Sequence, residues 1–208
     1  MLYTKTVEPG TLSLLRQLMT MPQLKKFSLV GGTALSLQYG HRTSVDLDLF
    51  CTEGYEYYTL VESLKKEFGE NFKHEAKESN FGIFCFINSI KTDIINYNHQ
   101  LIDNLFESDD IRMYSSKDIA AMKIQAILGR GRKKDFWDLA ELLKNYSLEQ
   151  LIDFYSKKYP SQQLLISIPQ AITYFDDAEE SENPISLKGQ TWEGVKKIIQ
   201  RHVNEYLK

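Results

Sequence analysis

The spacing of apolar residues changes near residue 112, and this change constrains the fold more than any other feature of the chain. Before it, residues 44–51 and 90–97 have the pattern of strands, while residues 11–21 and 55–68 place their apolar side chains along one face of a helix. After it, the apolar spacing is helical. We therefore expect an α+β fold in which a small mixed β-sheet flanked by helices is followed by a C-terminal helical lobe.

Short local signals refine the first half. Residues 27–32 and 81–87 are apolar runs that favour two more strands, and residues 33–40 favour a helix that stops at Gly40. Asn88 and Ser89 stand between two strand patterns and predict a turn.

The second half begins with a capping signal. Ser115 or Ser116 can cap a helix that starts at residue 117, and further helices are expected over residues 133–146, 148–159 and 192–207. The acidic segment 176–190 is the best candidate for a linker. We predict a core domain over residues 1–112 and a helical domain over residues 113–208.

Composition limits the class of protein. The 208 residues are 42% hydrophobic and 25% charged, which is typical of a folded globular chain and excludes disorder as its main state. A net charge of -3 argues against polyanion binding over the whole surface. The two cysteines, Cys51 and Cys85, cannot build a disulfide framework, and no run has the length of a signal peptide or membrane span. We expect a cytoplasmic protein that does not enter a membrane.

Two aspartates interrupt the apolar pattern of residues 44–51. In a strand, Asp46 and Asp48 project from the same face, while Val45, Leu47 and Leu49 point into the core. Like charges so close together are stabilised by a cation between them, and carboxylates are preferred ligands of Mg²⁺. The alternative is a half-exposed strand whose aspartates face water.

Gly31, Gly32 and Thr33 lie between a predicted strand and the start of a helix. Free N–H groups and the helix dipole at such a point attract phosphate, and glycine allows it to approach closely. These three residues could therefore hold a triphosphate. The alternative is a tight turn in which Thr33 is a simple N-cap.

A third carboxylate, Asp93, lies in the predicted strand over residues 90–97. Three acids on neighbouring strands can hold two Mg²⁺ ions roughly 3.5–4 Å apart and activate a hydroxyl for in-line attack on phosphorus. Asp93 would then be a metal ligand and a possible base. A surface aspartate near a turn is the other interpretation.

Lys123 has apolar residues at the helical positions three and four away on either side. Such a lysine either extends along the surface or points into a cleft towards phosphates. Downstream, the basic run 130–134 is the best local polyanion patch, although such a run is more often a solvated helix entry.

Three segments, GGTALSLQYGHRTSVDLDLF, IKTDIINY and SSKDIAAMKIQAILGRGRKKDFWDLAELL, together resemble a known family. They are similar to the abortive-infection nucleotidyltransferase toxins (AbiEii/AbiGii-like) of the DNA polymerase β-like nucleotidyltransferase superfamily, over about residues 26–145. The resemblance implies the nucleotidyltransferase fold and transfer of a nucleoside monophosphate from an NTP, with tRNA 3′ ends among the acceptors. It also implies a separate antitoxin protein as a partner.

The resemblance also assigns roles to residues. It implies that Asp46 and Asp48 are the catalytic metal-binding pair and that Asp93 is the third acid. Thr33 stands where the superfamily usually has serine, and Gly32 and Thr33 would bind the triphosphate. Gly31, Arg42 and Lys123 are further expected nucleotide contacts, and Arg42, Lys123 and the basic run 130–134 would offset the charge of phosphate or RNA. Lys123 and Asp138 match a lysine and its acidic partner in the helical motif, although Asp135 and Asp138 are both candidates for the residue that faces the cleft.

Three functions are compatible with these motifs. The leading hypothesis is a Mg²⁺-dependent nucleotidyltransferase toxin with an RNA or tRNA acceptor. The second is a module that binds nucleotide without turnover, and the retained acids argue against it. The third keeps the transfer but uses a protein or a small molecule as the acceptor.

Overall fold

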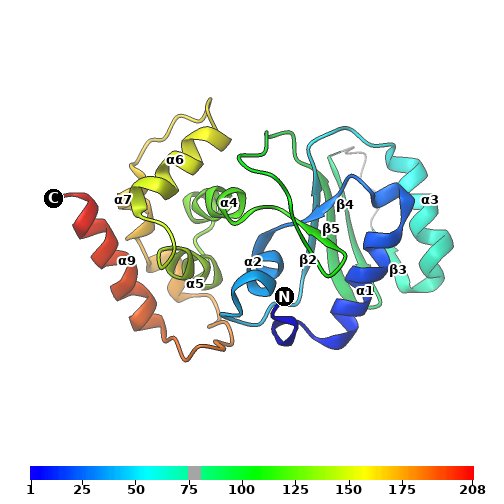
Figure 1. Ribbon diagram of the computed structural model, residues 1–208, viewed down its shortest axis with the longest axis horizontal. Helices are drawn as coiled ribbons and strands as arrows, with labels where there is room; N and C mark the ends of the chain where they lie inside the picture. The colour runs from blue at the N-terminus through cyan, green and yellow to red at the C-terminus, as the bar shows by residue number, and fades with distance from the viewer. Residues whose placement is uncertain (75–80) are drawn as a thin grey trace.

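The computed structural model describes residues 1–74 and 81–208 and contains one mixed sheet (Figure 1). The strand order is β3-β4-β5-β2-β1-β7-β6. The bounds are β1 Ser28–Leu29, β2 Leu47–Cys51, β3 Phe72–His74, β4 Gly82–Ile87, β5 Ile90–Asn96, β6 Phe106–Ser108 and β7 Ile111–Met113. The sheet confirms the α+β prediction.

The centre of the sheet carries the predicted acidic strands. β2 and β5 run parallel, with Asp48 paired to Asp93 in the register. β4 and β5 form an antiparallel hairpin whose turn residues, Asn88 and Ser89, have φ values of 51° and 65°. Two consecutive residues with positive φ suit the twist of a two-residue hairpin, so the predicted turn is confirmed.

The hairpin of β6 and β7 is absent from the sequence-based prediction. Its turn residues, Asp109 and Asp110, also have positive φ values, 52° and 61°. β7 continues the sheet by pairing in parallel with β1. Each strand has only three residues, which is too short for a period-two pattern to stand out.

Three helices belong to the first half of the chain: α1 Pro9–Thr20, α2 Gly31–Tyr39 and α3 Tyr57–Phe68. Short 3-10 turns cover Thr4–Thr6, Pro22–Leu24 and Gly69–Asn71. α2 ends at Gly40 in the left-handed conformation, as predicted. It contacts β2 on one side and α4 and α5 on the other, so it lies between the sheet and the later helices (Figure 1).

The second half is helical. Its helices are α4 Ser116–Gly129, α5 Lys133–Leu142, α6 Leu148–Lys158, α7 Ile168–Ile172, α8 Asp176–Glu179 and α9 Trp192–Tyr206. Ser115 caps α4 by accepting a hydrogen bond from the Asp118 N–H, which decides between the two candidate caps. One apolar core cluster runs from Leu2 to Val203, and the division of the chain at residue 112 stays a prediction.

The acidic segment 176–190 is bound to the rest of the protein, so the linker prediction is wrong. The Thr43 N–H donates to the Ile185 carbonyl at 3.0 Å, and the Leu187 N–H donates to the His41 carbonyl at 2.9 Å. This short antiparallel pairing attaches the segment to the loop that leads to Asp46.

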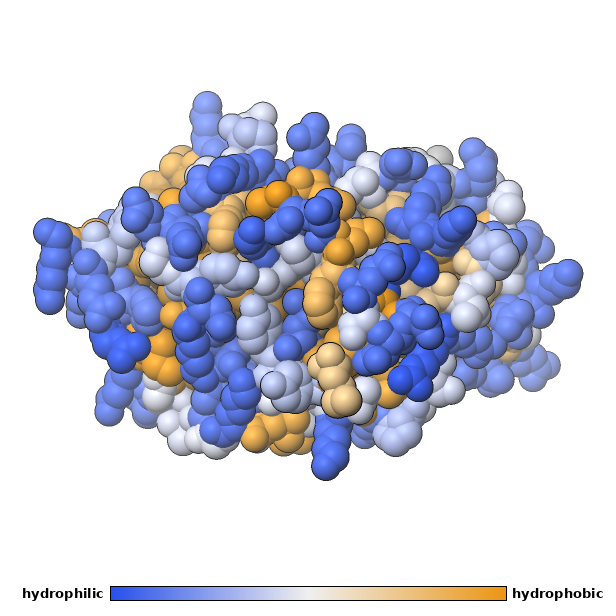
Figure 2. Space-filling model, viewed as in Figure 1, coloured by the Kyte–Doolittle hydropathy of each residue, from blue (hydrophilic) through white to orange (hydrophobic). Residues whose placement is uncertain are grey.

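The surface has the character expected from the composition. Figure 2 shows hydrophilic residues over most of the face that it draws, with hydrophobic residues in scattered groups. Within residues 1–74 and 81–208, every helix is too short or too polar to cross a bilayer.

Candidate active site

Asp48 and Asp93 lie side by side on β2 and β5. Paired residues of neighbouring strands are about 4.8 Å apart, and both side chains are partly exposed on the same sheet face. Burial, and next the negative charge of Asp93, raise the pKa of Asp48 above its ordinary value. The fold thus brings together two of the three predicted acids from residues far apart in the sequence.

Asp93 has one oxygen engaged and one free. Its Oδ2 accepts a hydrogen bond from Lys91 Nζ at 2.5 Å. Its Oδ1 is buried and has no hydrogen-bond partner within the described part of the chain. A buried carboxylate oxygen without a donor is costly unless a ligand supplies one, so this atom marks a point where a cation or a substrate group would fit.

Asp46 lies just before β2, which begins at Leu47. Because the strand starts later than expected, Val45 does not enter the core; it is 58% exposed. Asp46 Oδ2 is 3.6 Å from Lys134 Nζ of α5. In the ranges 1–74 and 81–208, no three acidic, histidine or cysteine side chains are gathered closely enough to hold a metal ion by themselves. Asp46 is therefore near the acidic pair without completing a cage around it.

The glycine pair leaves room for two charged side chains. Gly31 has φ +70°, and a Cβ at this position would lie 2.7 Å from Asp48 Oδ2. A Cβ on Gly32 would lie 2.2 Å from Arg42 Nη2. α2 starts at Gly31, and no side chain caps it. Its N-terminus, with the partial positive charge of unpaired N–H groups, thus lies directly against the Asp48 carboxylate.

Thr33 is buried, with 1% of its surface exposed. Its hydroxyl donates to the Asp46 carbonyl oxygen at 2.5 Å and lies 2.8 Å from Ser44 Oγ. The side chain therefore holds the loop that carries Asp46. Because the hydroxyl is occupied in this way, Thr33 acts on the site through the backbone that it fixes.

Asp138 is the centre of a buried ion cluster. Its Oδ1 lies 2.7 Å from His41 Nε2 and accepts from Arg42 Nε at 2.6 Å, and its Oδ2 accepts from Arg42 Nη2 at 2.8 Å. Lys123 Nζ is 2.6 Å from the same Oδ2. Burial alone would raise the pKa of Asp138, but the charges of Arg42 and Lys123 outweigh it and hold the pKa well below its ordinary value.

Asp135 extends this cluster. It accepts from Lys123 Nζ at 3.0 Å and from Arg130 Nε at 3.2 Å. Asp135 and Asp138 are both fully buried, so neither faces a cleft. Lys123 and Arg42 are 5% and 3% exposed, and both are committed to carboxylates. The structure places these four predicted site residues in a buried network that contacts the start of α2 through Arg42, which lies against Gly32.

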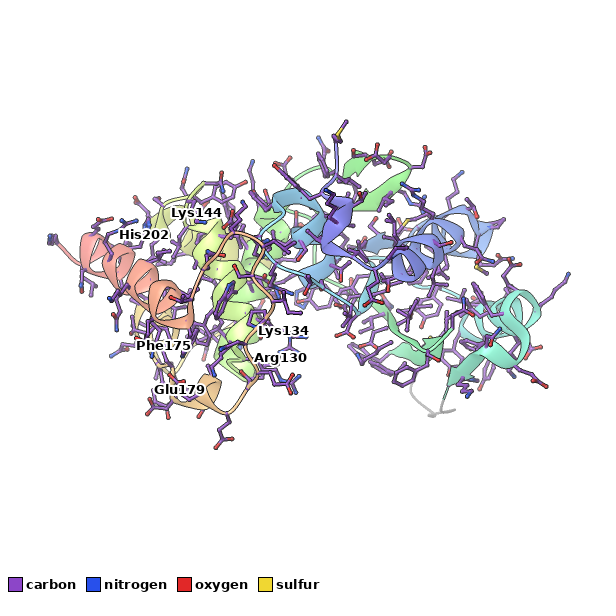
Figure 3. All side chains as sticks on the ribbon, turned by 90° about the horizontal axis from the view of Figure 1, so that it is seen from below. Arg130, Lys134, Lys144, Phe175, Glu179 and His202 are labelled. Carbon is purple, nitrogen blue, oxygen red and sulfur yellow. The ribbon has the colours of Figure 1, made fainter. Side chains whose placement is uncertain are left out.

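The basic run 130–134 lies where the helical half faces the sheet. Figure 3 labels Arg130 and Lys134, which lie near each other at the side of α4 and α5 turned towards the strands. A cavity of about 540 Å³ there is lined by Arg130, Arg132 and Lys134 and by residues of the acidic segment, Asp177, Glu180, Ser181 and Glu182. Neighbouring acids thus offset part of the charge of the basic run.

Two lysines near the acids were not named individually as site residues, and Lys134 was expected only as part of the basic run 130–134. Lys91 lies two residues before Asp93, so the period-two pattern of the strand could have revealed that both share one face. Lys134 was visible only as one member of a basic run, and no sequence signal connects it to Asp46. Its position depends on how α5 packs against the sheet half.

A mixed sheet with an acidic pair, beside the two glycines that open α2, is the arrangement that the sequence motifs predicted for a nucleotidyltransferase. A Helicobacter pylori protein provisionally described as a nucleotidyltransferase has a similar fold, with a TM-score of 0.50 and 16% identity over 97% of this chain and 99% of that one. The Aquifex aeolicus protein aq_aa25, itself uncharacterized, is 33% identical over 188 residues, which is 87% of this chain and 88% of that one.

The chain belongs to the family of the nucleotidyl transferase AbiEii toxin of type IV toxin–antitoxin systems, whose model matches residues 13–188. The resemblance seen in the sequence is therefore confirmed. The match extends well past the 26–145 segment that carries the motifs and includes α6, α7 and α8, and it ends before α9.

Proposed function

We propose that the protein is a Mg²⁺-dependent nucleotidyltransferase that transfers a nucleoside monophosphate from an NTP to an RNA, with a tRNA 3′ end as the first acceptor to examine. The observation that carries the proposal is the pairing of Asp48 with Asp93 on neighbouring strands, against the uncapped N-terminus of α2. An acidic pair next to a phosphate-binding helix start is what in-line attack on a nucleoside triphosphate requires.

The donor groups fit a hard divalent cation. Mg²⁺ is usually held by one or two carboxylates together with substrate phosphates and water, so a complete protein cage is not needed. Asp48 and Asp93 would supply the carboxylates, with Asp46 as a third candidate, and two ions are expected. When bound, Mg²⁺ offsets phosphate charge and makes an attacking hydroxyl more acidic. The unpartnered Oδ1 of Asp93 supports this assignment.

The residues of the chain would then divide the work of transfer. The N–H groups of Gly31 and Gly32 would hold the triphosphate, and Lys134 would offset its charge next to Asp46. As the acceptor oxygen bonds to the α-phosphorus, the bond from that phosphorus to pyrophosphate breaks. Asp93 is the candidate acceptor of the hydroxyl proton.

Arg42 and Lys123 have a positioning role in this proposal. Arg42 Nη2 lies against Gly32, and its guanidinium is fixed by two hydrogen bonds to Asp138. The positive charge of both side chains, buried near Gly32 at the start of α2, would add to the attraction for phosphate without direct contact. Thr33 would keep Asp46 in place through its carbonyl oxygen.

The family supports the cellular role that we propose. A type IV toxin is countered by a separate antitoxin protein. Transfer of a nucleotide to RNA would make this chain an inhibitor of growth, as in abortive phage infection. Cys51 and Cys85 are both free and buried thiols, which fits a reducing cytoplasm.

The direct test incubates the protein with each labelled NTP, Mg²⁺ and total tRNA, in parallel with Asp48→Asn and the surface control Asp153→Asn, whose side chain is 50% exposed in α6. We expect label in the RNA with wild type and the control. The rate of transfer by Asp48→Asn should be at least about a hundredfold lower than that of wild type, because a lost metal ligand removes several kcal/mol of transition-state stabilisation.

The other outcomes separate the competing functions. NTP binding without transfer to any acceptor would favour the binding module. Labelled protein or metabolite would favour another acceptor. If Asp48→Asn and Asp46→Asn both transferred label at the wild-type rate, the metal site proposed above would have to be abandoned.

A further inference from the structure

Two phenylalanines are exposed on the strand next to the acidic pair. Phe84 and Phe86 of β4 are 41% and 51% exposed, whereas Ile83, Cys85 and Ile87 between and beside them are buried. Their alternation shows that one face of β4 packs on the core and that the other presents aromatic rings. An exposed aromatic pair on a sheet face commonly marks a binding surface.

The strand register connects these rings to the acids. Phe84 pairs with Asp93, and Asp93 pairs with Asp48, so these three side chains form one row across β4, β5 and β2. In the next row, Phe86 stands between Lys91 of β5 and Lys73 of β3. The aromatic rings therefore begin about one strand spacing, roughly 5 Å, from Asp93.

This face is also hollowed. A cavity of about 430 Å³ is lined by Lys73, His74, Phe84, Cys85, Phe86, Lys91 and Asp93. It thus combines aromatic rings, two lysines and the acid that is proposed to receive the acceptor proton. Aromatic stacking platforms flanked by cations are the common means of binding single-stranded nucleic acid, because every base has a flat face and every linkage a phosphate.

We propose that this face binds the single-stranded end of the RNA acceptor, an inference that rests on the proposed function and adds where the acceptor lies. Bases near the 3′ end stack on Phe84 and Phe86. Lys73 pairs with the phosphates, and Lys91, which also donates to Asp93 Oδ2, places a second positive charge beside them. The terminal hydroxyl then lies at Asp93, on the side of the acidic pair away from α2, where the triphosphate is held.

A binding measurement tests this without catalysis. Fluorescence anisotropy of a labelled single-stranded oligoribonucleotide of about ten nucleotides is followed at one fixed salt concentration with wild type and Phe84→Ala/Phe86→Ala. Phe106→Ala is the matched control, since Phe106 is 42% exposed on β6 at the opposite edge of the sheet. We expect the double variant to bind about 5- to 150-fold more weakly for each base that loses its stack, and the control to bind like wild type.

Kinetics complete the test. The double variant should raise KM for RNA and leave KM for NTP unchanged, and Phe84→Trp, which keeps a stacking ring, should retain RNA binding. Thermal unfolding of each variant checks that it folds, which we expect because the replaced side chains are half exposed.

The outcomes distinguish the inference from the proposed function. If wild type labels RNA but the double variant matches Phe106→Ala, the acceptor approaches elsewhere and only this inference fails. If wild type binds the oligoribonucleotide through the two phenylalanines yet never transfers a nucleotide to RNA, the acceptor role is overturned. If it labels only a protein or a small molecule and binds no RNA, both proposals are wrong.

Discussion

Replacing Asp138 by Asn is the sharpest test of how the site is supported. The substitution keeps the shape of the side chain and removes its charge, while Arg42 and Lys123 remain buried. Lys123 keeps Asp135 as a partner, but the Arg42 guanidinium loses the negative charge opposite it and one of the two acceptor oxygens that it binds, because an Asn amide has a single acceptor oxygen. Removing one member of a buried charge network typically costs about 3–5 kcal/mol, because an uncompensated charge stays in the interior.

The expected loss is large enough to measure directly. For a chain of this size, about 2–4 °C of melting temperature is lost per kcal/mol, so Asp138→Asn should lower Tm by about 6–20 °C in calorimetry. Glu141→Gln on the same helix is the matched control. Its carboxylate is buried too, but it pairs with Lys144 and Lys188, whose side chains are 41% and 39% exposed. Both lysines can regain water, so no uncompensated charge stays in the interior and the cost should be smaller than that of Asp138→Asn.

The same variant changes the pH dependence of stability. The pKa of Asp138 is held below its ordinary value in the folded protein, so the folded state binds fewer protons than the unfolded state in acid. Its contribution is present above the ordinary carboxyl pKa, about 3.8, and is lost as the pH falls through the folded value. The free energy of unfolding, measured with urea between pH 3 and 6, should therefore fall less steeply with decreasing pH in Asp138→Asn than in wild type. The reasoning is refuted if this variant is no less stable than Glu141→Gln and keeps the wild-type slope.

Two further predictions concern the turn and the thiols. Gly31→Ala places a Cβ at 2.7 Å from Asp48 Oδ2 at a φ of +70°, so nucleotide transfer should fall at least about tenfold. Gly10→Ala is the control, because nothing lies within 4 Å of its Cβ, and it should transfer like wild type. Equal activity of the two variants in the tRNA assay would contradict the expected clash between the new Cβ at position 31 and Asp48. Burial raises the pKa of Cys51 to about 11 and that of Cys85 to about 12. Neither thiol should therefore react with iodoacetamide at pH 8 until urea unfolds the chain. Alkylation of the folded protein, detected by mass spectrometry, would be inconsistent with this expectation.

Local signals were sufficient for many elements of the fold. The helix stop at Gly40, the turn at Asn88 and the serine cap of α4 each depend on residues close together in the chain, so sequence patterns could predict them. The β6–β7 hairpin escaped prediction because strands of three residues are too short for a pattern. The attachment of Ile185 to the loop before Asp46 escaped because it joins segments more than a hundred residues apart.

The candidate site divides in the same way. Sequence reasoning identified Asp46, Asp48 and Asp93 as the candidate metal-binding acids, because spacing along a strand and resemblance to a family are properties of the chain itself. The resemblance also gave Asp138 as the acidic partner of Lys123, and the two side chains lie 2.6 Å apart. The sequence did not indicate that Arg42 shares this partner, and both cations were expected to face a nucleotide. The structure instead pairs both with Asp138, 96 residues beyond Arg42.

The sequence by itself determined most of the longer strands and helices, the three candidate acids, and the family of the protein. Only the tertiary structure decided that Asp93 stands beside Asp48, that Gly31 and Gly32 make room for Asp48 and Arg42, and that the predicted nucleotide ligands Arg42 and Lys123 are buried supports. The physical reason is that periodicity encodes what each segment forms, whereas the energy of a buried charge depends on the partners that the packing of distant segments brings to it.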